Sequence, residues 1–385
     1  MSTKMFKKIA SYFIIWRVSL FFIAFLSIYF LPVFGARFPY AERVLEITRL
    51  PYWIWGFGNF DGVHYLRIAQ DGYLAQYSQA FFPIFPLLIR FFSLIFPRIP
   101  NLDTNIFTDP TYFYSGIILS NLFFLGALYM FYKLINIDFK KDVAYLSVIL
   151  LLVFPTSFFY GAIYTESLFL LLAASSIYLI RKKHFFWATV LICLSTATRI
   201  TGVLLIPLYL IEAFRSKKNI NYIWSFITPF GVLMYMYYLK SAFDNPLYFL
   251  TSQPIFGAGR SSSEIILLPQ IIYRYIKIFL TTAINSLPFF NSLLEFIFTL
   301  VPLGFLIAFF KKMRLSYWVF SISTLLLPTF TGTFSSMPRY ALVPMVLLIP
   351  YLITPFRKFI RPVIPVSAFL AMILTMLFIR GYWVA

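Results

Sequence analysis

The sequence is poor in cysteine, histidine and acidic residues. Its 385 residues include one Cys, two His and 13 Asp or Glu. The single thiol, Cys193, lies in an apolar stretch, so neither a disulfide framework nor a cysteine metal site is possible. Charged residues of both signs make up only 12% of the chain, about half the share found in soluble domains. Each acidic residue is therefore an informative position.

Apolar and aromatic residues dominate the chain instead. It is 61% hydrophobic, with 49 Phe and 27 Tyr, and its mean hydropathy is +0.83. This composition is typical of an all-α polytopic membrane protein. The net charge of +19 would suit nucleic-acid binding, but the Lys and Arg residues occur in short clusters between apolar runs. Such clusters are topology signals, so no nucleic-acid partner is expected.

Eleven apolar runs have the length or composition of membrane helices. The first, 9–34, follows three lysines as a signal peptide would, but it is too long and aromatic for one and lacks a small-residue cleavage site. We expect it to be a retained helix. The other runs cover 111–133, 143–160, 163–180, 185–198, 201–214, 221–240, 291–310, 316–333, 339–355 and 362–380. The sequence thus predicts about 11 transmembrane helices in one domain, 1–385.

The basic clusters predict the orientation of the chain in the cell membrane. They lie at 133–141, 181–183, 215–218, 311–314 and 357–361. They agree with one another only if all of them face the cytoplasm together with the N-terminus. The apolar run 81–96 is broken by Pro83, Pro86 and Arg90, and counting it as a span would invert every later cluster. We therefore expect an interfacial helix there.

This topology places two long segments outside the membrane. The first extracytoplasmic loop, 35–110, holds six acidic residues: Glu42, Glu46, Asp61, Asp71, Asp103 and Asp109. The second, 241–290, contains a Gly/Ser stretch at 257–263 that is typical of a mobile loop. Because nearly half of the acidic residues are in the first loop, we expect the function to reside on the outer face.

Four ionisable residues are the leading candidates for a functional site. Asp61 lies among aromatic residues just after the first span. Glu166, Arg199 and Arg339 lie near the outer ends of later spans, where ionisable groups in apolar surroundings are functional candidates. All four are expected at one membrane level, an arrangement that suits an anionic, lipid-linked ligand.

Each candidate also has a structural interpretation. Asp61 could be the N-cap of a helix beginning near Val63. Arg199 and Arg339 could extend to phospholipid headgroups, and Glu166 could form a purely structural ion pair. Asp61 with His64 could bind a metal, but two ligands at this spacing without further His or Cys are a weak indication.

Three motifs resemble the PIG-V mannosyltransferase family and its bacterial relatives. The run 60–73, aromatic-Asp-x-x-His-Tyr-Leu-x-Ile-Ala-x-x-Gly-Tyr, followed by Ala-Phe-Phe-Pro-Ile-Phe-Pro at 80–86, resembles the family's first luminal loop. The runs Tyr-Thr-Glu-Ser-Leu-Phe at 164–169 and Thr-Arg-Ile-Thr-Gly at 198–202 resemble two later family elements, in the same order. The chain departs from the family where Phe60 replaces Trp and where Ile-Thr replaces Ser-Asn after Arg199.

The resemblance implies a GT-C glycosyltransferase that takes a hexose, most simply mannose, from a polyprenyl-phosphate donor. Asp61 would be the general base for a glycolipid or glycan acceptor. Arg199 and Arg339 would bind the donor phosphate. The substrate-binding residues would be His64, Tyr65, Tyr164 and Glu166. No cofactor is expected, and a divalent metal is possible but not predicted, because the arginines could neutralise the phosphate and there is no Asp-x-Asp pair.

Two other functions remain open from the sequence. A transporter or flippase of lipid-linked sugars would place its charges near the bilayer midplane and would have broken helices in paired halves. The acids here are concentrated in one external loop instead, which favours an enzyme. A non-catalytic scaffold is the third possibility, although it would have no need for Asp, Glu and Arg at one membrane level.

Overall fold

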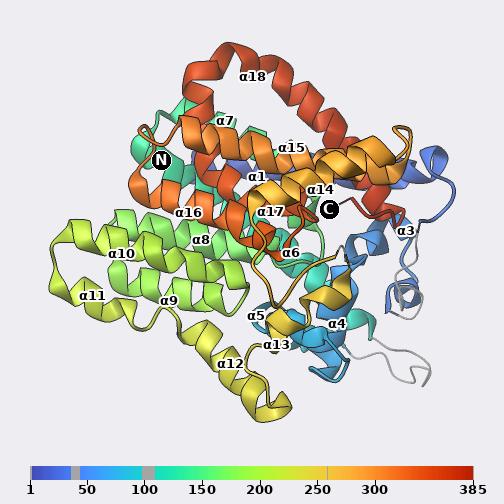
Figure 1. Ribbon diagram of the computed structural model, residues 1–385, viewed down its shortest axis with the longest axis horizontal. Helices are drawn as coiled ribbons and strands as arrows, with labels where there is room; N and C mark the ends of the chain where they lie inside the picture. The colour runs from blue at the N-terminus through green and yellow to red at the C-terminus, as the bar shows by residue number, and fades with distance from the viewer. Residues whose placement is uncertain (1, 36–43, 98–108, 258, 385) are drawn as a thin grey trace.

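All regular elements that the structure describes are helices. The computed structural model describes residues 2–35, 44–97, 109–257 and 259–384. Within these ranges the chain forms α-helices and short 3-10 helices, which confirms the predicted all-α class (Figure 1). Glu42 and Asp103, two of the acids of the first loop, lie outside the described residues.

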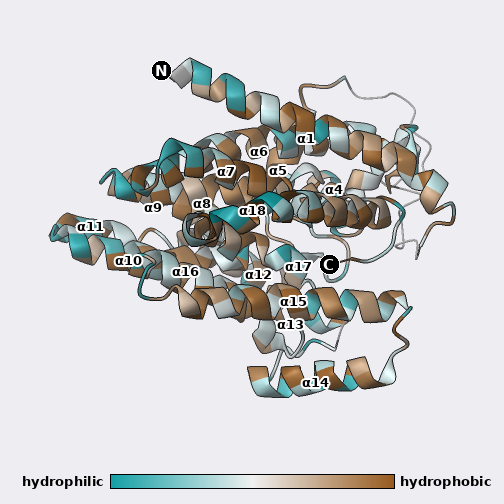
Figure 2. Cartoon of the chain, turned by 90° about the horizontal axis from the view of Figure 1, so that it is seen from above, coloured by the Kyte–Doolittle hydropathy of each residue, from teal (hydrophilic) through white to brown (hydrophobic). Residues whose placement is uncertain are grey.

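Four of the described helices are long and apolar enough to cross a membrane. They are α1 (Ser2–Phe30), α6 (Pro110–Asp138), α15 (Leu287–Ala308) and α18 (Leu342–Ile379). Hydrophobic residues run along α1, α15 and α18 (Figure 2). Shorter helices, many of them apolar, lie among these four, as expected of a multi-pass membrane protein. The count of 11 crossings stays a prediction.

Several predicted spans are shorter or broken in the structure. The run 143–160 forms α7 (Lys141–Leu152) and a 3-10 helix, η4 (Ser157–Gly161), because Pro155 lies between them. The runs 201–214 and 316–333 likewise contain a 3-10 helix next to an α-helix. These are η5 (Ile200–Leu204) with α10 (Leu205–Ser216), and α16 (Leu315–Leu326) with η7 (Leu327–Thr331). The prediction of continuous helices over these runs was wrong.

The structure corrects one more predicted boundary, and it shows another as a kink. The run 221–240 is divided by Pro229 into α11 (Asn219–Ser225) and α12 (Phe230–Phe243). The runs 339–355 and 362–380 were predicted as separate spans. After the short α17 (Met337–Tyr340), they form α18, which consists of two helices that meet at a kink with non-helical torsion angles at Phe356. The predicted break between the two runs is thus present, as a kink just before the basic cluster at 357–361.

The two segments predicted to be external pack against each other. The first contains η1 (Glu46–Thr48), α3 (Tyr52–Trp55), η2 (Gly56–Gly58), α4 (Asp61–Asp71), η3 (Ser78–Ala80) and α5 (Ile84–Ser93). The second contains α13 (Tyr248–Thr251), η6 (Gln253–Phe256) and α14 (Leu268–Thr281). Phe82 of the first lies against Phe249 of the second, with ring centroids 5.2 Å apart, and α4, α5 and α13 lie together in Figure 1.

The run 81–96 contains a helix, α5, as expected, and its position at the membrane interface stays a prediction. It buries Phe85 and Ile89 and exposes Leu87 and Phe91, so one face packs on the protein and the other is left open. An amphipathic helix of this kind is suited to the surface of a bilayer.

Three irregular segments meet in the interior of the helical bundle. They are 153–165, before α8 (Glu166–Arg181), 197–204, after α9 (Phe185–Thr196), and 327–341, before α18. The Thr156 hydroxyl donates to the Pro338 carbonyl at 2.6 Å, which links the first segment to the third. Irregular backbone at membrane depth is tolerated only where it is enclosed by protein or lines a cavity. Arg199 and Arg339 lie in these segments, Glu166 directly follows the first of them, and Asp61 lies at the start of α4.

Candidate active site

Asp61 is held at the first turn of α4 by an unusual backbone. The preceding residue, Phe60, has φ 57° and ψ −116°, a region that a bulky residue rarely adopts. The turn is attached to the C-terminal end of α18, because the Asn59 side-chain amide donates to the carbonyls of Phe378 and Ile379 at 2.9 and 3.2 Å. Strain of this kind persists only where the surroundings enforce it, and it is common at functional sites.

Tyr164 fixes the backbone of Asp61. Its hydroxyl donates to the Asn59 carbonyl at 2.9 Å and accepts from the Asp61 amide at 3.2 Å. The ring is 1% exposed, so Tyr164 contacts the Asp61 turn and not the surface. Tyr164 thus holds the Asp61 backbone in place through two hydrogen bonds.

The N-cap interpretation of Asp61 is wrong. Phe60 occupies the N-cap position of α4, and no side chain caps this helix. The Asp61 carboxylate instead accepts a hydrogen bond on Oδ2 from Nη1 of Arg339 at 2.6 Å, and its side chain is 20% exposed. Asp61 is therefore both ion-paired and accessible.

Asp61, Glu166, Arg199 and Arg339 form one chain of ion pairs, which we name the Asp61 cluster. Nε of Arg339 lies 3.5 Å from Oε1 of Glu166, and Nη1 of Arg199 donates to the same oxygen at 2.5 Å. The side chains of Glu166, Arg199 and Arg339 are 4%, 12% and 9% exposed. The arginines therefore bind acids inside the protein, which contradicts the interpretation that they extend to headgroups. Four separate segments meet here.

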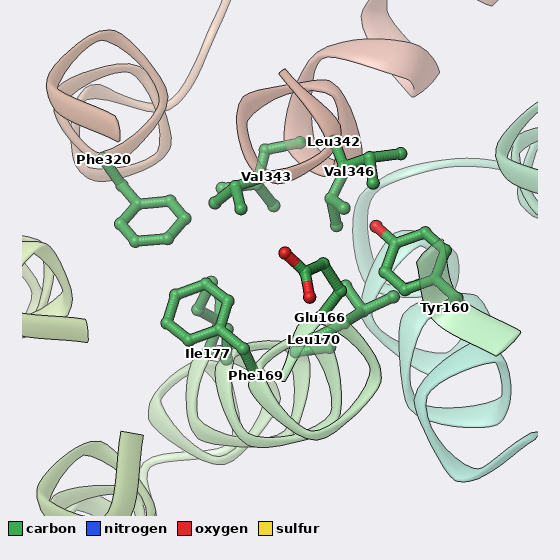
Figure 3. A pocket seen from close by; sticks show the side chains of 12 residues that line it. Tyr160, Glu166, Phe169, Leu170, Ile177, Phe320, Leu342, Val343 and Val346 are labelled. Atoms are coloured by element: carbon green, nitrogen blue, oxygen red, sulfur yellow. The ribbon is translucent and has the colours of Figure 1, made fainter. Parts of the chain in front are cut away.

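The second oxygen of Glu166 faces a narrow apolar pocket. Figure 3 shows the carboxylate at the centre of this pocket, among Tyr160, Phe169, Phe320 and Val343. Oε2 is buried and has no hydrogen-bond partner among the described residues. The negative charge of Glu166 is therefore stabilised from one side only, by Arg199 and Arg339.

His64 lies next to Asp61 in an aromatic environment. Its ring stacks on Phe81 with a centroid separation of 4.6 Å and lies edge-on to Phe256 at 5.8 Å. Burial lowers the pKa of His64 below its ordinary value, and Arg67 acts in the same direction while Asp61 opposes the shift. A neutral imidazole can donate or accept one hydrogen bond, as the orientation of a hydroxyl requires.

Tyr65 packs behind the site. Its hydroxyl lies 3.5 Å from Oγ1 of Thr165, and its ring packs edge-on against Phe81 and Phe85. Burial raises the pKa of Tyr65, so the phenol stays protonated. The substrate-binding roles of Tyr65, Tyr164, His64 and Glu166 stay predictions, and the geometry places the two tyrosines as supports.

Two residues that the sequence did not single out lie beside the Asp61 cluster. The Tyr340 hydroxyl is 3.4 Å from Nη2 of Arg339, and the Tyr340 ring lies 5.8 Å from the guanidinium of Arg199. Arg260, from the second external segment, donates from Nη2 to Oγ of Ser336 at 3.1 Å. Glu166 and Arg199 were identified because each is a charged residue that interrupts an apolar run. Neither Tyr340 nor Arg260 interrupts such a run in the sequence.

The described residues do not gather three His, Cys, Asp or Glu side chains into a group that could hold a metal ion. Asp61 and His64 are one turn apart on α4, but no third such ligand joins them within the described ranges. The donor set is rich in guanidinium groups, which repel cations and attract phosphate. Metal dependence stays untested.

The sequence matches one known family. The model of the family described as "Mannosyltransferase (PIG-V)" covers residues 6–223, more than half of the chain. This range includes Asp61, Glu166 and Arg199 and ends before Arg260 and Arg339. A comparison with curated proteins found no match.

Solved structures of an archaeal enzyme are similar to this chain in layout. The Archaeoglobus fulgidus oligosaccharyltransferase in its apo form matches with 13% identity and a TM-score of 0.45, over 96% of this chain and 56% of that one. Its complex with Zn and sulfate matches with 14% identity and a TM-score of 0.47, over 94% and 53%. The chain thus spans about half the length of the protein it is matched to.

Proposed function

The chain belongs to the PIG-V mannosyltransferase family, and on this premise we propose that it transfers mannose from a polyprenyl-phosphate donor to a glycolipid or glycan. The reaction would take place at the extracytoplasmic face of the cell membrane, with the N-terminus in the cytoplasm and a GT-C arrangement of about 11 crossings. The predicted orientation of the basic clusters supports this topology.

The geometry of Asp61 is the observation that carries the proposal. Its Oδ2 atom is occupied by Arg339, while Oδ1 has no hydrogen bond within the described part of the chain. A general base needs one free oxygen within reach of the proton that it takes. The pairing with Arg339 holds the carboxylate in one orientation, and the strained Phe60 and the Tyr164 hydroxyl fix its backbone.

The proposed step is a single displacement at the anomeric carbon. Oδ1 of Asp61 takes the proton of the acceptor hydroxyl, whose oxygen forms the new bond to the sugar. The bond from the sugar to the phosphate oxygen breaks, and the lipid phosphate leaves with the electron pair. Arginine side chains stabilise the charge that develops on this leaving group. One displacement inverts the anomeric carbon, so a β-linked donor gives an α-mannoside.

The proposal requires no cofactor. A lipid monophosphate leaving group carries less negative charge than a diphosphate, and guanidinium groups can neutralise it by bidentate hydrogen bonds. His64 and Glu166 would orient the hydroxyl groups of donor or acceptor. His64 lies one turn from Asp61 on α4, and Glu166 belongs to the same chain of ion pairs as Asp61.

The test is a transfer assay with purified protein in detergent. Radiolabelled polyprenyl-phosphate-mannose and a membrane glycolipid extract are supplied, with and without EDTA, and GDP-mannose replaces the lipid donor in a parallel reaction. We expect label to reach the acceptor from the lipid donor only, with or without EDTA. Label from GDP-mannose, or none from either donor together with movement of the lipid-linked sugar across liposomes, would contradict the proposal and favour a transporter.

A further inference from the structure

The Asp61 cluster has no positive charge to spare. Arg339 is paired with Asp61 and lies close to Glu166, and Arg199 is paired with Glu166. Two acids and two arginines sum to zero, and the lowered pKa of His64 keeps its imidazole neutral. A site for an anionic phosphate in a poorly solvated environment needs an excess of cationic groups. The two arginines assigned to the donor phosphate therefore cannot supply it alone.

Arg260 brings a further cation to this cluster. Its Nη2 atom donates to Ser336, and the Ser336 carbonyl accepts from the backbone amides of Arg339 and Tyr340 at 3.1 and 3.0 Å. Arg260 is thus linked through Ser336 to the turn that carries Arg339. The Arg339 and Arg199 guanidinium groups lie beside Tyr340, and the charge of Arg260 also acts on its hydroxyl, so all three cations lie near one side chain.

Arg260 makes no direct ion pair with an acid. No carboxylate lies within ion-pair distance of it among the described residues. Its charge acts on Glu295, but that carboxylate accepts a hydrogen bond from the Tyr275 hydroxyl. The hydrogen bond from Arg260 to Ser336 leaves the other guanidinium nitrogens available, and the residue is only partly buried. It thus differs from Arg199 and Arg339, whose contacts include buried acids.

The backbone around Arg260 is tied to both sides of the site. The Ser261 amide donates to the Thr331 carbonyl at 2.8 Å, in the irregular segment that leads to Arg339. On the other side, Phe256 packs edge-on against Phe81 at 5.5 Å and against His64. Gly257 and Gly259 have φ 80° and 62°, values that a residue with a side chain rarely adopts. The turn that presents Arg260 is therefore specified by glycine.

We propose that Arg260 binds the donor phosphate and supplies a cation that the Asp61 cluster itself cannot spare. No acid holds Arg260 in a direct ion pair within the described residues, so its remaining donors can bind the negative charge of a sugar phosphodiester. This inference rests on the proposed function for the identity of the donor, but the phosphate contact is testable without turnover.

The experiment compares Arg260→Gln and Arg260→Lys with wild type in two measurements. The first is the KM for polyprenyl-phosphate-mannose and for the acceptor. The second is the Kd of polyprenyl phosphate, measured by intrinsic tryptophan fluorescence of the purified protein. Lys277→Gln is the matched control, because it removes one exposed cation from α14 of the same segment.

We expect Arg260→Gln to raise the donor KM and the Kd of polyprenyl phosphate about 10- to 100-fold, as loss of a charged hydrogen bond implies. The acceptor KM should not change. The donor KM and the Kd of Arg260→Lys should lie between those of wild type and Arg260→Gln, because lysine keeps the charge but lacks the planar guanidinium group. Lys277→Gln should match wild type in both measurements.

Two results would overturn the inference. One is a donor KM and a Kd that are unchanged in Arg260→Gln. The other is equal weakening in Lys277→Gln, which would indicate a general surface charge effect. If wild type shows no mannosyl transfer but Arg260→Gln still weakens polyprenyl phosphate binding, the proposed function fails and the phosphate contact stands. A lowered Tm with unchanged Kd would show that Arg260 is only structural.

Discussion

The two ends of α8 carry ion pairs of different character. At its first residue, Glu166 belongs to the Asp61 cluster. At its last residue, Arg181 donates from both terminal nitrogens to the two oxygens of Asp138, and also to the Tyr317 hydroxyl at 2.7 Å. Nearby, Arg314 binds both oxygens of Glu212, at 2.6 and 2.5 Å, and Ser316 donates to the same carboxylate. We name these the Asp138 cluster: Asp138, Arg181, Glu212 and Arg314.

The difference lies in how fully each cluster uses its hydrogen-bonding atoms. In the Asp138 cluster both pairs are bidentate, and they link α6, α8, α10 and α16. In the Asp61 cluster, Oε2 of Glu166 and Nε of Arg339 have no hydrogen-bond partner among the described residues, and Phe60 holds a strained backbone. Saturated pairs stabilise a fold, whereas buried polar atoms without partners need an explanation, and a bound substrate provides one.

Arg339→Gln should have the largest combined effect on stability and turnover, because it removes the residue that contacts both acids of the Asp61 cluster. The buried Glu166 and the partly exposed Asp61 then lose their shared cation, which costs about 3–5 kcal/mol of stability. Turnover should fall about 100- to 1000-fold, as expected for loss of transition-state charge stabilisation. The turnover is measured in a transfer assay, and the stability is measured by thermal unfolding in detergent.

Arg314→Gln is the control for this variant in the Asp138 cluster. It should lower Tm while the turnover of the folded fraction stays at the wild-type level. If Arg314→Gln reduced turnover as strongly as Arg339→Gln, the distinction between the clusters would be lost.

Glu166→Gln and Glu212→Gln should separate activity from stability. Glu166→Gln leaves the Asp61 cluster with one extra positive charge and should reduce turnover about 10-fold or more, from the loss of a charged hydrogen bond. Glu212→Gln weakens a bidentate pair and should cost about 1–3 kcal/mol of stability, with turnover unchanged. Equal loss of turnover in both variants would contradict this.

His64 should give the smallest effect, on the pH dependence of stability. Because burial lowers its pKa below the ordinary value of about 6.5, the unfolded chain binds a proton that the folded chain does not as pH falls below 6.5. This contribution to stability is present above pH 6.5 and is lost below it. His64→Gln should therefore lose less Tm than wild type on acidification from about pH 7.5 to about pH 5.5. An identical loss would contradict the buried, neutral imidazole.

Part of the site could be predicted from the sequence because charge is rare in this chain. Asp61, Glu166, Arg199 and Arg339 each interrupt apolar or aromatic surroundings, and the structure brings all four together. Arg260 was not recognised, because it lies in a polar loop where a cation is unremarkable. Its relevance depends on the contact with Ser336, which lies 76 residues further along the chain.

Helix boundaries were harder to predict for a different reason. Hydropathy registers apolar side chains but not backbone breaks, so the 3-10 segment η4 was included in a predicted span. At Phe356 the predicted break before the basic cluster is present, as a kink between the two helical parts of α18. Pairing of Asp61 with Arg339, 278 residues apart, replaced the local N-cap that the sequence allowed.

The most direct test of the account is the rate of mannosyl transfer by Asp61→Asn, with Asp138→Asn as the same substitution in the Asp138 cluster. Asparagine keeps the size and the hydrogen bond to Arg339 but cannot take a proton. We predict a turnover of the folded protein about 100- to 10,000-fold below wild type for Asp61→Asn, and wild-type turnover for Asp138→Asn. Full transfer activity in Asp61→Asn would contradict the account, because the acceptor would then be deprotonated without this carboxylate.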